Sequence, residues 1–505
     1  MQRRRFLQGA ATGSALALAG CTAPAISERD SGRWDQTVDV LVAGSGAAAT
    51  SAAIDAHRTG VSTLVLEKLT VIGGSSAMSG GVIYLGGGTP LQKVCGFEDS
   101  RQAMYDYIAN ASHLHPQLDK IARYCDGSLE HFDWLVGNGV PFVPRFSNVR
   151  EMTFGDESLY YSGSEKAWPY RDLARPAPRG HVPSREGLKG VNGGRVLMQA
   201  LHASARAQGI RFVTDAKVQR LVVGDDGAVL GVQALIAGEL RRIRARGGVV
   251  LACGGFIHNR AMVREHAPEL YDCSTPWANM GDMGEGIQMG VSVGAGTLRM
   301  DQGFSIVPIY PPNQVVKGIV VNRSGQRFIN EDVYHARLGD AIAYHEQGKA
   351  WLICDADSAY GYDDYRVKVV AQADTVAELG RALKFPDAVL EQTVQYYNRF
   401  AAQKQDPMFH KQEEYLSPLQ KAPFVAYDLS VDKAFFVAHT FGGLHTSVDT
   451  EVLNGFGEAI PGLYAAGRTS HGIPTSPYIG SGISVGDSLF FGRVAGRHAA
   501  GRVAA

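Results

Sequence analysis

The clearest pattern of apolar and polar positions begins at Thr37. From there the chain reads TVDVLVAGSGAAATSAAIDAHRTGVSTLVLEK: an apolar run, a glycine-containing turn, an alanine-rich stretch and a second apolar run ending at Glu67. Two short apolar runs joined by one helical segment are typical of a βαβ unit, whose strands lie parallel in one sheet. The pattern therefore predicts an α/β fold from this point onward.

The turn of this unit has the features of a dinucleotide site. Gly44 and Gly46 permit a tight turn and a close approach of the backbone to a pyrophosphate, and Ala49 takes the place of a third glycine. The start of the following helix favours an anionic group. Glu67 lies 21 positions beyond Gly46, where its carboxylate can accept hydrogen bonds from an adenosine ribose. The unit therefore predicts dinucleotide binding.

A second glycine-rich run at 68–89 indicates which dinucleotide. A simple nicotinamide enzyme would not need this run, and its glycine pairs indicate backbone packed against a large flat ligand. Residues 211–222 and 247–256, with a strand ending at Gly467, are similar to the later strands of an FAD domain. A helix that starts at Gly482 would direct its positive end at the flavin. We therefore predict FAD as the cofactor.

The stretch 286–430 has a different texture. It is richer in Tyr, Lys and Gln, and PDAVLEQTVQYYNRFAAQ within it has helical periodicity. An insertion of about 145 residues is large enough for a domain. We predict an α/β protein with a two-dinucleotide-fold, Rossmann-like FAD domain, discontinuous over 36–285 and 431–505. An inserted α+β cap at 286–430 would close over the flavin and carry catalytic residues.

Composition, net charge and cysteine spacing argue against some classes of function. The chain has 505 residues, a formal net charge of -1 and 45% apolar residues, which predicts more than one domain and gives no attraction for nucleic acid. The cysteines form no CxxC pair and no cluster with metal spacing, so we expect neither zinc nor an iron-sulfur centre. The six cysteines are Cys21, Cys95, Cys125, Cys253, Cys273 and Cys354.

Residues 1–30 predict export. The start MQRRRFLQGAATGSALALAGCTAPA combines arginines, a short apolar run and small residues, and it resembles a twin-arginine signal. The apolar run is too short for a spanning helix. LAGC, ending at Cys21, resembles a lipobox that would leave this cysteine lipidated, whereas APA at 23–25 offers ordinary cleavage. We expect a periplasmic protein or one anchored to the membrane and facing the periplasm.

Taken together, these segments resemble the fumarate reductase and succinate dehydrogenase flavoprotein superfamily. Within it, GGSSAMSGGVIYLGGGT, GQRFINEDVYHAR and YIGSGISVGDSLFFGR are most similar to the 3-ketosteroid dehydrogenases. That resemblance implies an FAD-dependent oxidoreductase that desaturates ring A beside the C3 ketone of a steroid. Other members of the superfamily reduce fumarate or urocanate, so a reductase of an unsaturated acid stays open as the alternative.

The residues expected at a carboxylate site are different here. Fumarate reductases hold the substrate carboxylate with an arginine, and alignment places Tyr478 at that position. A second arginine, which delivers a proton, is replaced by Tyr334 or His335. A phenol is a poor replacement for the bidentate, charge-assisted pair that a guanidinium makes with a carboxylate. A neutral ketone is therefore the better substrate for this site.

The family resemblance also implies the roles of the site residues. Tyr478 and the N–H of Gly482 would hold the C3 oxygen and stabilise the enolate as it forms. Tyr334 matches the family's catalytic tyrosine and would take the α-proton, while flavin N5 accepts the β-hydride. A tyrosine with an ordinary pKa near 10 needs help to act as a base. The candidate helpers are His335, Tyr160 and Tyr161.

Several alternatives stay open. Tyr334 and Tyr478 could be buried phenols with structural hydrogen bonds, and His439, which matches a carboxylate-contacting histidine of fumarate reductases, could simply hold its loop. Relatives that desaturate C4–C5 carry tyrosine and serine two positions apart, whereas Tyr478 and Ser481 are three apart. The sequence therefore leaves the 1,2- and 4,5-positions of the double bond unresolved.

The reaction also needs an electron acceptor, and we expect a quinone or another acceptor.

The predicted cofactor contacts come from several separate stretches of the chain. The cofactor residues are Gly44, Gly46, Ala47, Ala48, Glu67, Lys68, Gly74, Ser75, Ser76, Ser79, Gly80, Gly81, Ala216, Val218, Ala252, Gly254, Gly467, Arg468, Ser481, Ile483, Ser484 and Val485.

Overall fold

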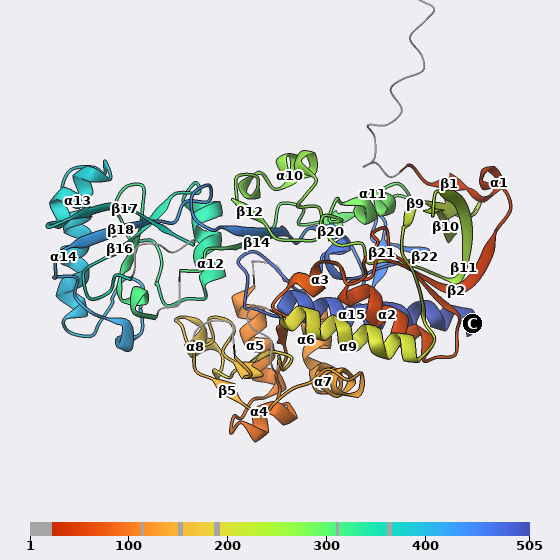
Figure 1. Cartoon of the computed structure of the whole chain (residues 1–505), viewed down its shortest axis with the longest axis horizontal. Coiled ribbons are helices and arrows are strands. Elements are labelled where there is room, and N and C mark those ends of the chain that lie inside the picture. The colour runs from red at the N-terminus through yellow and green to blue at the C-terminus, as the bar shows by residue number, and fades with distance from the viewer. Residues whose placement is uncertain are drawn as a thin grey trace, which may run out of the picture.

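A nine-stranded sheet forms the centre of the larger part of the molecule (Figure 1). The computed structural model describes residues 23–112, 116–149, 155–185, 192–309, 313–360 and 366–504. Within the sheet, β11, β2, β3 and β8 follow one another in parallel, and β22 pairs with β11 in parallel. Their bounds are Glu239–Leu251, Gln36–Ala43, Thr63–Leu66, Arg211–Val213 and Ala459–Ala465. This parallel core confirms the predicted α/β fold.

Antiparallel strands extend the sheet on its other side. β9 (Ala216–Val223) and β10 (Val229–Ile236) continue from β11, and β21 (Glu451–Leu453) pairs with β22. β1 (Ile26–Ser27) adds to β9 in parallel, so the described chain joins the sheet almost where it begins. The arginines of the predicted export signal and Cys21 lie outside the described residues.

Helices α2 (Ala47–His57) and α15 (Ile483–Ala504) pack closely together. A Cβ on Gly492 would lie 2.3 Å from the Ala48 carbonyl oxygen, and one on Gly496 would lie 2.1 Å from that of Ala52. Any larger residue at these two positions would push the helices apart. The glycines therefore allow the C-terminal helix to lie on the first helix of the dinucleotide unit.

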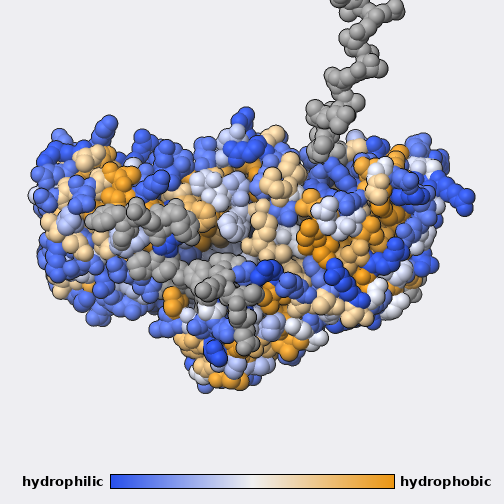
Figure 2. All heavy atoms as spheres, viewed as in Figure 1, coloured by the Kyte–Doolittle hydropathy of each residue, from blue (hydrophilic) through white to orange (hydrophobic). Residues whose placement is uncertain are grey.

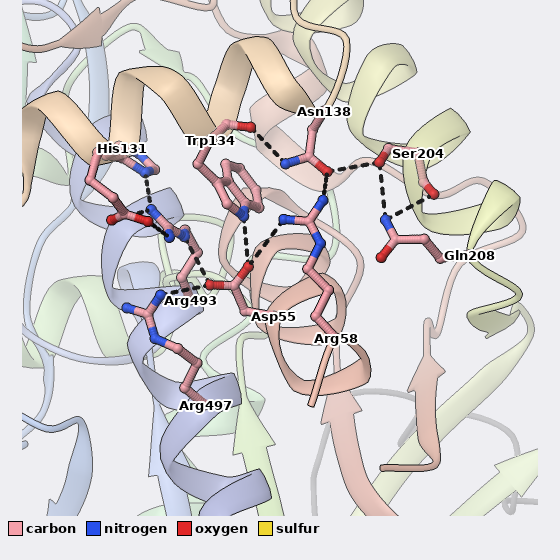
Figure 3. Close-up of polar contacts among 10 residues, drawn as sticks. Asp55, Arg58, His131, Trp134, Asn138, Ser204, Gln208, Arg493 and Arg497 are labelled. Atoms are coloured by element: carbon pink, nitrogen blue, oxygen red, sulfur yellow. Dashed lines mark hydrogen bonds and ion pairs between the residues drawn. The ribbon is translucent and has the colours of Figure 1, made fainter. Parts of the chain in front are cut away.

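Buried polar contacts connect the same two helices to α7 (Ser128–Gly137), as Figure 3 shows. The Asp55 carboxylate accepts hydrogen bonds from Trp134 Nε1 at 2.6 Å, Arg493 Nε at 2.9 Å and Arg497 Nη1 at 2.8 Å. Segments from both ends of the chain thereby meet at one carboxylate.

A second, four-stranded antiparallel sheet lies at the opposite end of the molecule (Figure 1). Its strands run in the order β15, β16, β18 and β17, with bounds Ile319–Asn322, Ala350–Cys354, Phe424–Asp428 and Lys368–Ala373. α13 (Val376–Ala382) and α14 (Val389–Ala401) pack against it, the latter within the predicted helix. Hydrophilic residues cover most of this end on the face shown in Figure 2. The exact bounds of the cap stay a prediction.

A small sheet and a short helix join the two ends. β14 (Gly303–Ile306) and β12 (Thr275–Pro276) flank β19 (Val437–Thr440), and α12 (His335–Asp340) packs on β14. A Cβ on Gly339 would lie 2.5 Å from the Ser305 carbonyl oxygen, so the helix approaches the strand closely. This packing fixes Tyr334, the residue that caps the start of α12.

The segment between the first glycine-rich runs and β8 forms a third lobe (Figure 1). It contains α5 (Arg101–Ala111), α6 (Leu118–Asp126), α7 and the small sheet of β4 (Ile83–Tyr84), β7 (Gly180–His181), β6 (Leu159–Tyr160) and β5 (Phe146–Ser147). Among the described residues, no helix combines the length and apolar character needed to cross a bilayer.

Candidate active site

A cavity opens where β2, β3, β11 and β22 end. Ligand sites in open parallel sheets lie outside the carboxyl ends of the strands. The predicted cofactor residues that line it are Gly44, Gly46, Ala47, Ala48, Glu67, Lys68, Gly74, Ser75, Ser76, Ala216, Val218, Ala252, Gly254, Gly467 and Arg468. The structure therefore brings most of that set together.

The glycine turn fits a pyrophosphate. Gly44 has a φ of 107°, and a Cβ there would lie 2.3 Å from the Ala252 carbonyl oxygen, so only glycine fits this position. Gly46 is the N-cap of α2 and has no side chain to cap the helix, and the Ala47 N–H donates to Ser76 Oγ at 3.0 Å. Ala47 and Ala48 line the cavity, so the positive end of the helix favours an anion there.

The predicted ribose acceptor is in place at the end of β3. The Glu67 carboxylate is 7% exposed, accepts a hydrogen bond from Ser45 Oγ at 2.6 Å and accepts another from the Leu69 N–H at 2.9 Å. Each carboxylate oxygen has a second lone pair that can accept a ribose hydroxyl. These two bonds fix the carboxylate before any ligand binds.

A loop that sequence reasoning missed closes the cavity on one side. Asn279, Asp282 and Glu285 line it, from a stretch that reads ANMGDMGEG. Ser75 Oγ accepts from the Asn279 N–H at 2.9 Å, which fastens this loop to the second glycine run. Lys68 Nζ contacts Glu285 at 2.5 Å. The alternation of glycine and acidic residues is the only sequence signal that could have indicated a ligand loop here.

Arg468 also lines the cavity. Its Nη2 lies 2.5 Å from Asp282 Oδ2. Its Nη1 is buried and has no hydrogen-bond partner within the described part of the chain. An unpaired buried donor of this kind is costly unless a ligand accepts from it. The glycine turn, Glu67 and Arg468 together fit a dinucleotide cofactor.

Other predicted cofactor residues lie outside this cavity. Ser79 Oγ donates to the Ser76 carbonyl at 2.7 Å, and a Cβ on Gly81 would lie 2.1 Å from Gly193, so Gly81 packs against α9 (Gly193–Ala207). At this point the second glycine run packs against another helix. The predicted residues that do not line the cavity are Ser79, Gly80, Gly81, Ser481, Ile483, Ser484 and Val485.

Tyr478 stands at the start of α15. Its ring lies 4.8 Å from that of Phe304, edge to face, and 5.3 Å from that of Phe441, stacked. Its hydroxyl donates to Ser484 Oγ at 2.9 Å and accepts from the Ser484 N–H at 3.1 Å. Burial raises the pKa of Tyr478 to about 12, so the hydroxyl keeps its proton at neutral pH. The residue is a fixed, uncharged hydrogen-bond donor.

Tyr334 approaches the same region from α12. Its hydroxyl lies 2.6 Å from Ser481 Oγ, and its backbone N–H donates to Ser164 Oγ at 2.9 Å. The rings of Tyr334 and Tyr478 are 6.4 Å apart, measured between centroids. The structure thus places the two predicted tyrosines close together, and it adds Ser481 as a direct partner of Tyr334.

Gly482 supplies a backbone donor beside them. Its φ is 102°, and a Cβ would lie 2.7 Å from the Tyr84 nitrogen, so this position requires glycine. The Gly482 carbonyl accepts from the Tyr84 N–H at 3.1 Å. Across the described residues its own N–H donates no hydrogen bond. Its predicted role as a donor to a ligand oxygen stays a prediction.

His439 contacts the same aromatic residue, Phe304, that lies against Tyr478. Its ring stacks on Phe304 at 4.6 Å, and burial lowers its pKa well below the ordinary value, with Arg468 adding to the effect. Its Nε2 is buried without a hydrogen-bond partner among the residues that the structure describes. The imidazole is consequently neutral near pH 7.

The candidate helpers of Tyr334 differ in position. The His335 ring is 4.9 Å from that of Tyr334. Burial raises the pKa of Tyr160, and the Ser481 hydroxyl opposes that rise, which places Tyr160 beside the Tyr334–Ser481 pair. Tyr161 instead lines a separate polar cavity, where Lys166 Nζ lies 4.1 Å from its ring centroid. Tyr160 and His335 are therefore better placed than Tyr161.

The arginine nearest in sequence to Tyr334 is directed elsewhere. Arg337 Nη2 donates to the Ala111 carbonyl, and its guanidinium lies 4.5 Å from the centre of the Tyr170 ring. Arg337 is thus engaged with α5 and α8 (Tyr170–Leu173) rather than with a substrate carboxylate. This agrees with the expectation that the site holds an uncharged oxygen.

Comparison with known proteins supports the same picture. The family described as FAD binding domain matches residues 39–485. A 3-oxo-5-alpha-steroid 4-dehydrogenase from Comamonas testosteroni is 29% identical, over 88% of this chain and 94% of that protein. A urocanate reductase from Eggerthella lenta is 28% identical, over 92% of this chain and 74% of that protein.

One solved structure is more similar. The 3-ketosteroid-delta4-(5alpha)-dehydrogenase from Rhodococcus jostii RHA1, in complex with 4-androstene-3,17-dione, is 40% identical. The match covers 95% of this chain and 100% of that chain, with a TM-score of 0.89. These similarities confirm the predicted fold class and the resemblance to this branch of the superfamily.

Proposed function

The chain belongs to the FAD binding domain family, and from that premise we propose that it desaturates ring A of a 3-ketosteroid. The double bond would form between C4 and C5, because the 40% identical structure is that of a delta4-(5alpha)-dehydrogenase. The observation that carries the proposal is the pair of uncharged donors at the start of α15. Tyr478 and the Gly482 N–H lie where a carboxylate reductase would need a guanidinium.

The residues of the large cavity would hold FAD. The α2 turn would receive the pyrophosphate, Glu67 the ribose, and the Arg468 end the flavin side. When bound there, FAD supplies the hydride acceptor for the oxidation. This chain's own residues have to orient the steroid, exclude water and remove a proton.

Tyr478 and Gly482 would polarise the ketone. Two hydrogen bonds to one oxygen stabilise the negative charge that develops when the neighbouring carbon loses its proton. Because the Ser484 N–H also donates to the Tyr478 hydroxyl, the start of the helix holds that hydroxyl in place. To donate to the ketone, the Tyr478 hydroxyl has to break its hydrogen bond to Ser484 Oγ.

Tyr334 would remove the α-proton. Its hydroxyl shares a 2.6 Å hydrogen bond with Ser481, so a proton taken up by one oxygen can pass to the other. Tyr160 stands next to Ser481 and could extend this path. Tyr334→Phe should retain FAD and lose about 10²- to 10⁴-fold of turnover, the range for removal of an acid–base group.

The test is direct reduction by substrate. Purified holoprotein is mixed anaerobically with the saturated, 5α-reduced counterpart of 4-androstene-3,17-dione. Bleaching of the flavin absorbance, with formation of the 4-ene-3-one, supports the proposal. A 1-ene product would keep the ketosteroid class and overturn the 4,5-position, and an unchanged spectrum would overturn the function.

A reductase of an unsaturated acid is the second candidate. His439, with its unpartnered buried Nε2, is the observation that favours it, together with the urocanate reductase among the relatives. The protein is reduced with dithionite, and urocanate or fumarate is then added. Reoxidation by either acid supports this candidate in place of the first.

We also propose export by the twin-arginine route, with delivery of electrons to a quinone or another acceptor. The motif at residues 1–30 supports the export, and Cys21 is the proposed site of a lipid anchor. Cell fractionation of the wild type and a Cys21→Ser variant tests it. A cytoplasmic wild type would overturn the export, and identical fractions for both would overturn the anchor.

A further inference from the structure

A buried lysine and a buried aspartate hold the turn 471–473. Lys120 of α6 is 2% exposed, and its Nζ donates to the His471 carbonyl at 3.1 Å. The Ile473 N–H donates to Asp487 Oδ1 at 2.9 Å, and Asp487 is 3% exposed. The two charged side chains therefore bind opposite ends of one short turn.

The middle of this turn is built for close contact with the carboxylate. A Cβ on Gly472 would lie 2.3 Å from Asp487 Oδ1 and 2.4 Å from Oδ2. Gln117 Nε2 donates to the same His471 carbonyl as Lys120, at 3.2 Å. The turn is thus held by side chains from both α6 and α15.

The turn leads directly to Tyr478. Ser476 is fixed on the way, because its Oγ donates to Asp340 and its N–H donates to Gln302 Oε1 at 3.3 Å. Asp487 also lies three residues after Ser484, so the two share a helix face. Ser484 is the residue that exchanges hydrogen bonds with the Tyr478 hydroxyl. Asp487 is thus connected to Tyr478 through the turn 471–473, and it lies one helical turn from Ser484.

The charges of the pair depend on each other. Burial raises the pKa of Asp487 to about 6, and the positive charge of Lys120 opposes the rise. Burial lowers the pKa of Lys120 to about 8, and Asp487 and Asp119 oppose the fall. Besides each other, the titratable groups that face the two residues are Asp119, Tyr124, His445, His471 and Tyr478.

We propose that Lys120 and Asp487 are positioning residues for Tyr478, and that Asp487 has to be ionised for full turnover. The ionised carboxylate is the stronger acceptor for the Ile473 N–H. It also balances the buried ammonium that holds the His471 carbonyl. Protonation of Asp487 weakens both interactions and loosens the turn and the first turn of α15. This inference rests on the proposed ketosteroid oxidation, because Tyr478 has its role there.

The test compares pH profiles of kcat per bound flavin in the wild type and in Lys120→Met. The wild type should lose turnover below about pH 6. In Lys120→Met the carboxylate loses its counter-charge, so the acid limb should move up by about 1 pH unit. At pH 7.5, kcat should fall about tenfold with KM little changed. An acid limb that stays in place would overturn the inference.

Arg493→Met is the matched control. It also replaces a buried cation whose partner is an aspartate, on the same α15, but at the Asp55 cluster. A loss of packing should lower its stability without moving the acid limb. If Arg493→Met moves that limb as far as Lys120→Met does, the effect is general loosening and the inference is wrong.

A measurement without substrate keeps the test independent of the proposed function. Asp487 binds its proton more tightly when folded, so its contribution to stability is present below about pH 4 and is lost as the pH rises through about 6. The melting temperature of holoprotein is compared in the wild type and Asp487→Asn from pH 4.5 to 7.5. The difference between them should change across this window, and a constant difference would overturn the titration of Asp487. If the melting curves agree while no steroid reduces the flavin, the proposed function alone fails.

Discussion

Helix α15 carries two buried ionic clusters that differ in how completely their hydrogen bonds are satisfied. At its middle, Asp55 accepts from Trp134, Arg493 and Arg497, and Arg493 also contacts Glu130 at 2.5 Å (Figure 3). Near its start, Asp487 accepts from one backbone N–H and lies in the field of Lys120. We call the Asp55 group the saturated cluster, because its carboxylate accepts three side-chain hydrogen bonds. We call the Asp487 group the sparse cluster, because its carboxylate accepts one backbone hydrogen bond.

The two clusters have different consequences for the molecule. The Asp55 carboxylate accepts hydrogen bonds from three side chains, and such a cluster fixes the packing of helices far apart in the chain. A sparse one changes its charge within the pH range of the cell, and whatever it holds changes with it. The sparse cluster lies beside Tyr478 and the saturated one lies two turns further along the helix. Stability and function thus depend on different parts of one helix.

Arg493→Met should have the largest effect on stability. Arg493→Met removes a charge-assisted hydrogen bond to the buried Asp55, which keeps Arg497, and a bond of this kind contributes about 1.5 to 3 kcal/mol. The thermal midpoint of FAD release should fall markedly, while kcat per bound flavin stays near that of the wild type. Arg241→Met, on an exposed ion pair with Glu239, is the control and should change the midpoint little. Equal midpoints for both variants would contradict the contrast between the clusters.

Tyr478→Phe should lower turnover while leaving stability nearly unchanged. Loss of one of two donors to a developing oxyanion reduces kcat by about 10²- to 10³-fold. The FAD content and the melting temperature should stay close to those of the wild type. Tyr427→Phe removes a buried phenol of the cap, whose hydroxyl donates to the Tyr360 carbonyl at 2.8 Å, and should leave kcat unchanged. A Tyr478 variant with wild-type kcat would mean that the phenol is structural.

The lowered pKa of Lys120 predicts that turnover falls at alkaline pH. Its folded pKa is lowered to about 8, so above that pH the ammonium loses its proton and Asp487 loses its counter-charge. Turnover should fall by about three- to tenfold between pH 7.5 and 9, the scale of one ordinary net hydrogen bond. Because the unfolded chain binds this proton more tightly, the Lys120 contribution to stability should rise with pH from about 8 to 10.5. Lys120→Met should lack the alkaline limb, and its persistence there would assign the limb to another group.

The parts of the fold that follow local patterns were predictable. The βαβ unit, the glycine turn and Glu67 lie within 31 consecutive positions, from Thr37 to Glu67, and each has its own signal of periodicity or turn chemistry. The helix over 389–401 was equally clear from its apolar spacing. The predicted donors Tyr478 and Gly482 came from the family resemblance, and their roles stay predictions.

The remaining site residues depend on tertiary packing. Asn279 and Asp282 reach the cavity only because the 277–289 loop folds back over the second glycine run. Lys120 lies in a helix with many polar residues, and nothing in its neighbourhood distinguishes it from a surface lysine. Its burial results from contact with segments more than 300 positions later, which no local pattern records.

Ser484→Ala should have the smallest effect, and it tests what the serine does. In this structure Ser484 Oγ accepts a hydrogen bond from the Tyr478 hydroxyl, so a ketone has to compete with the serine for that donor. Removal of the competitor should lower KM by about two- to tenfold, the scale of one net hydrogen bond, with little change in kcat. The Ser484 N–H still donates to the phenol and holds it in place. Ser488→Ala, on the same helix and lining the cofactor cavity, is the control and should leave KM for the steroid unchanged. If KM rises in Ser484→Ala together with a loss of bound FAD, the serine contacts the cofactor, and the Tyr478 hydroxyl is then oriented by the backbone of α15 alone.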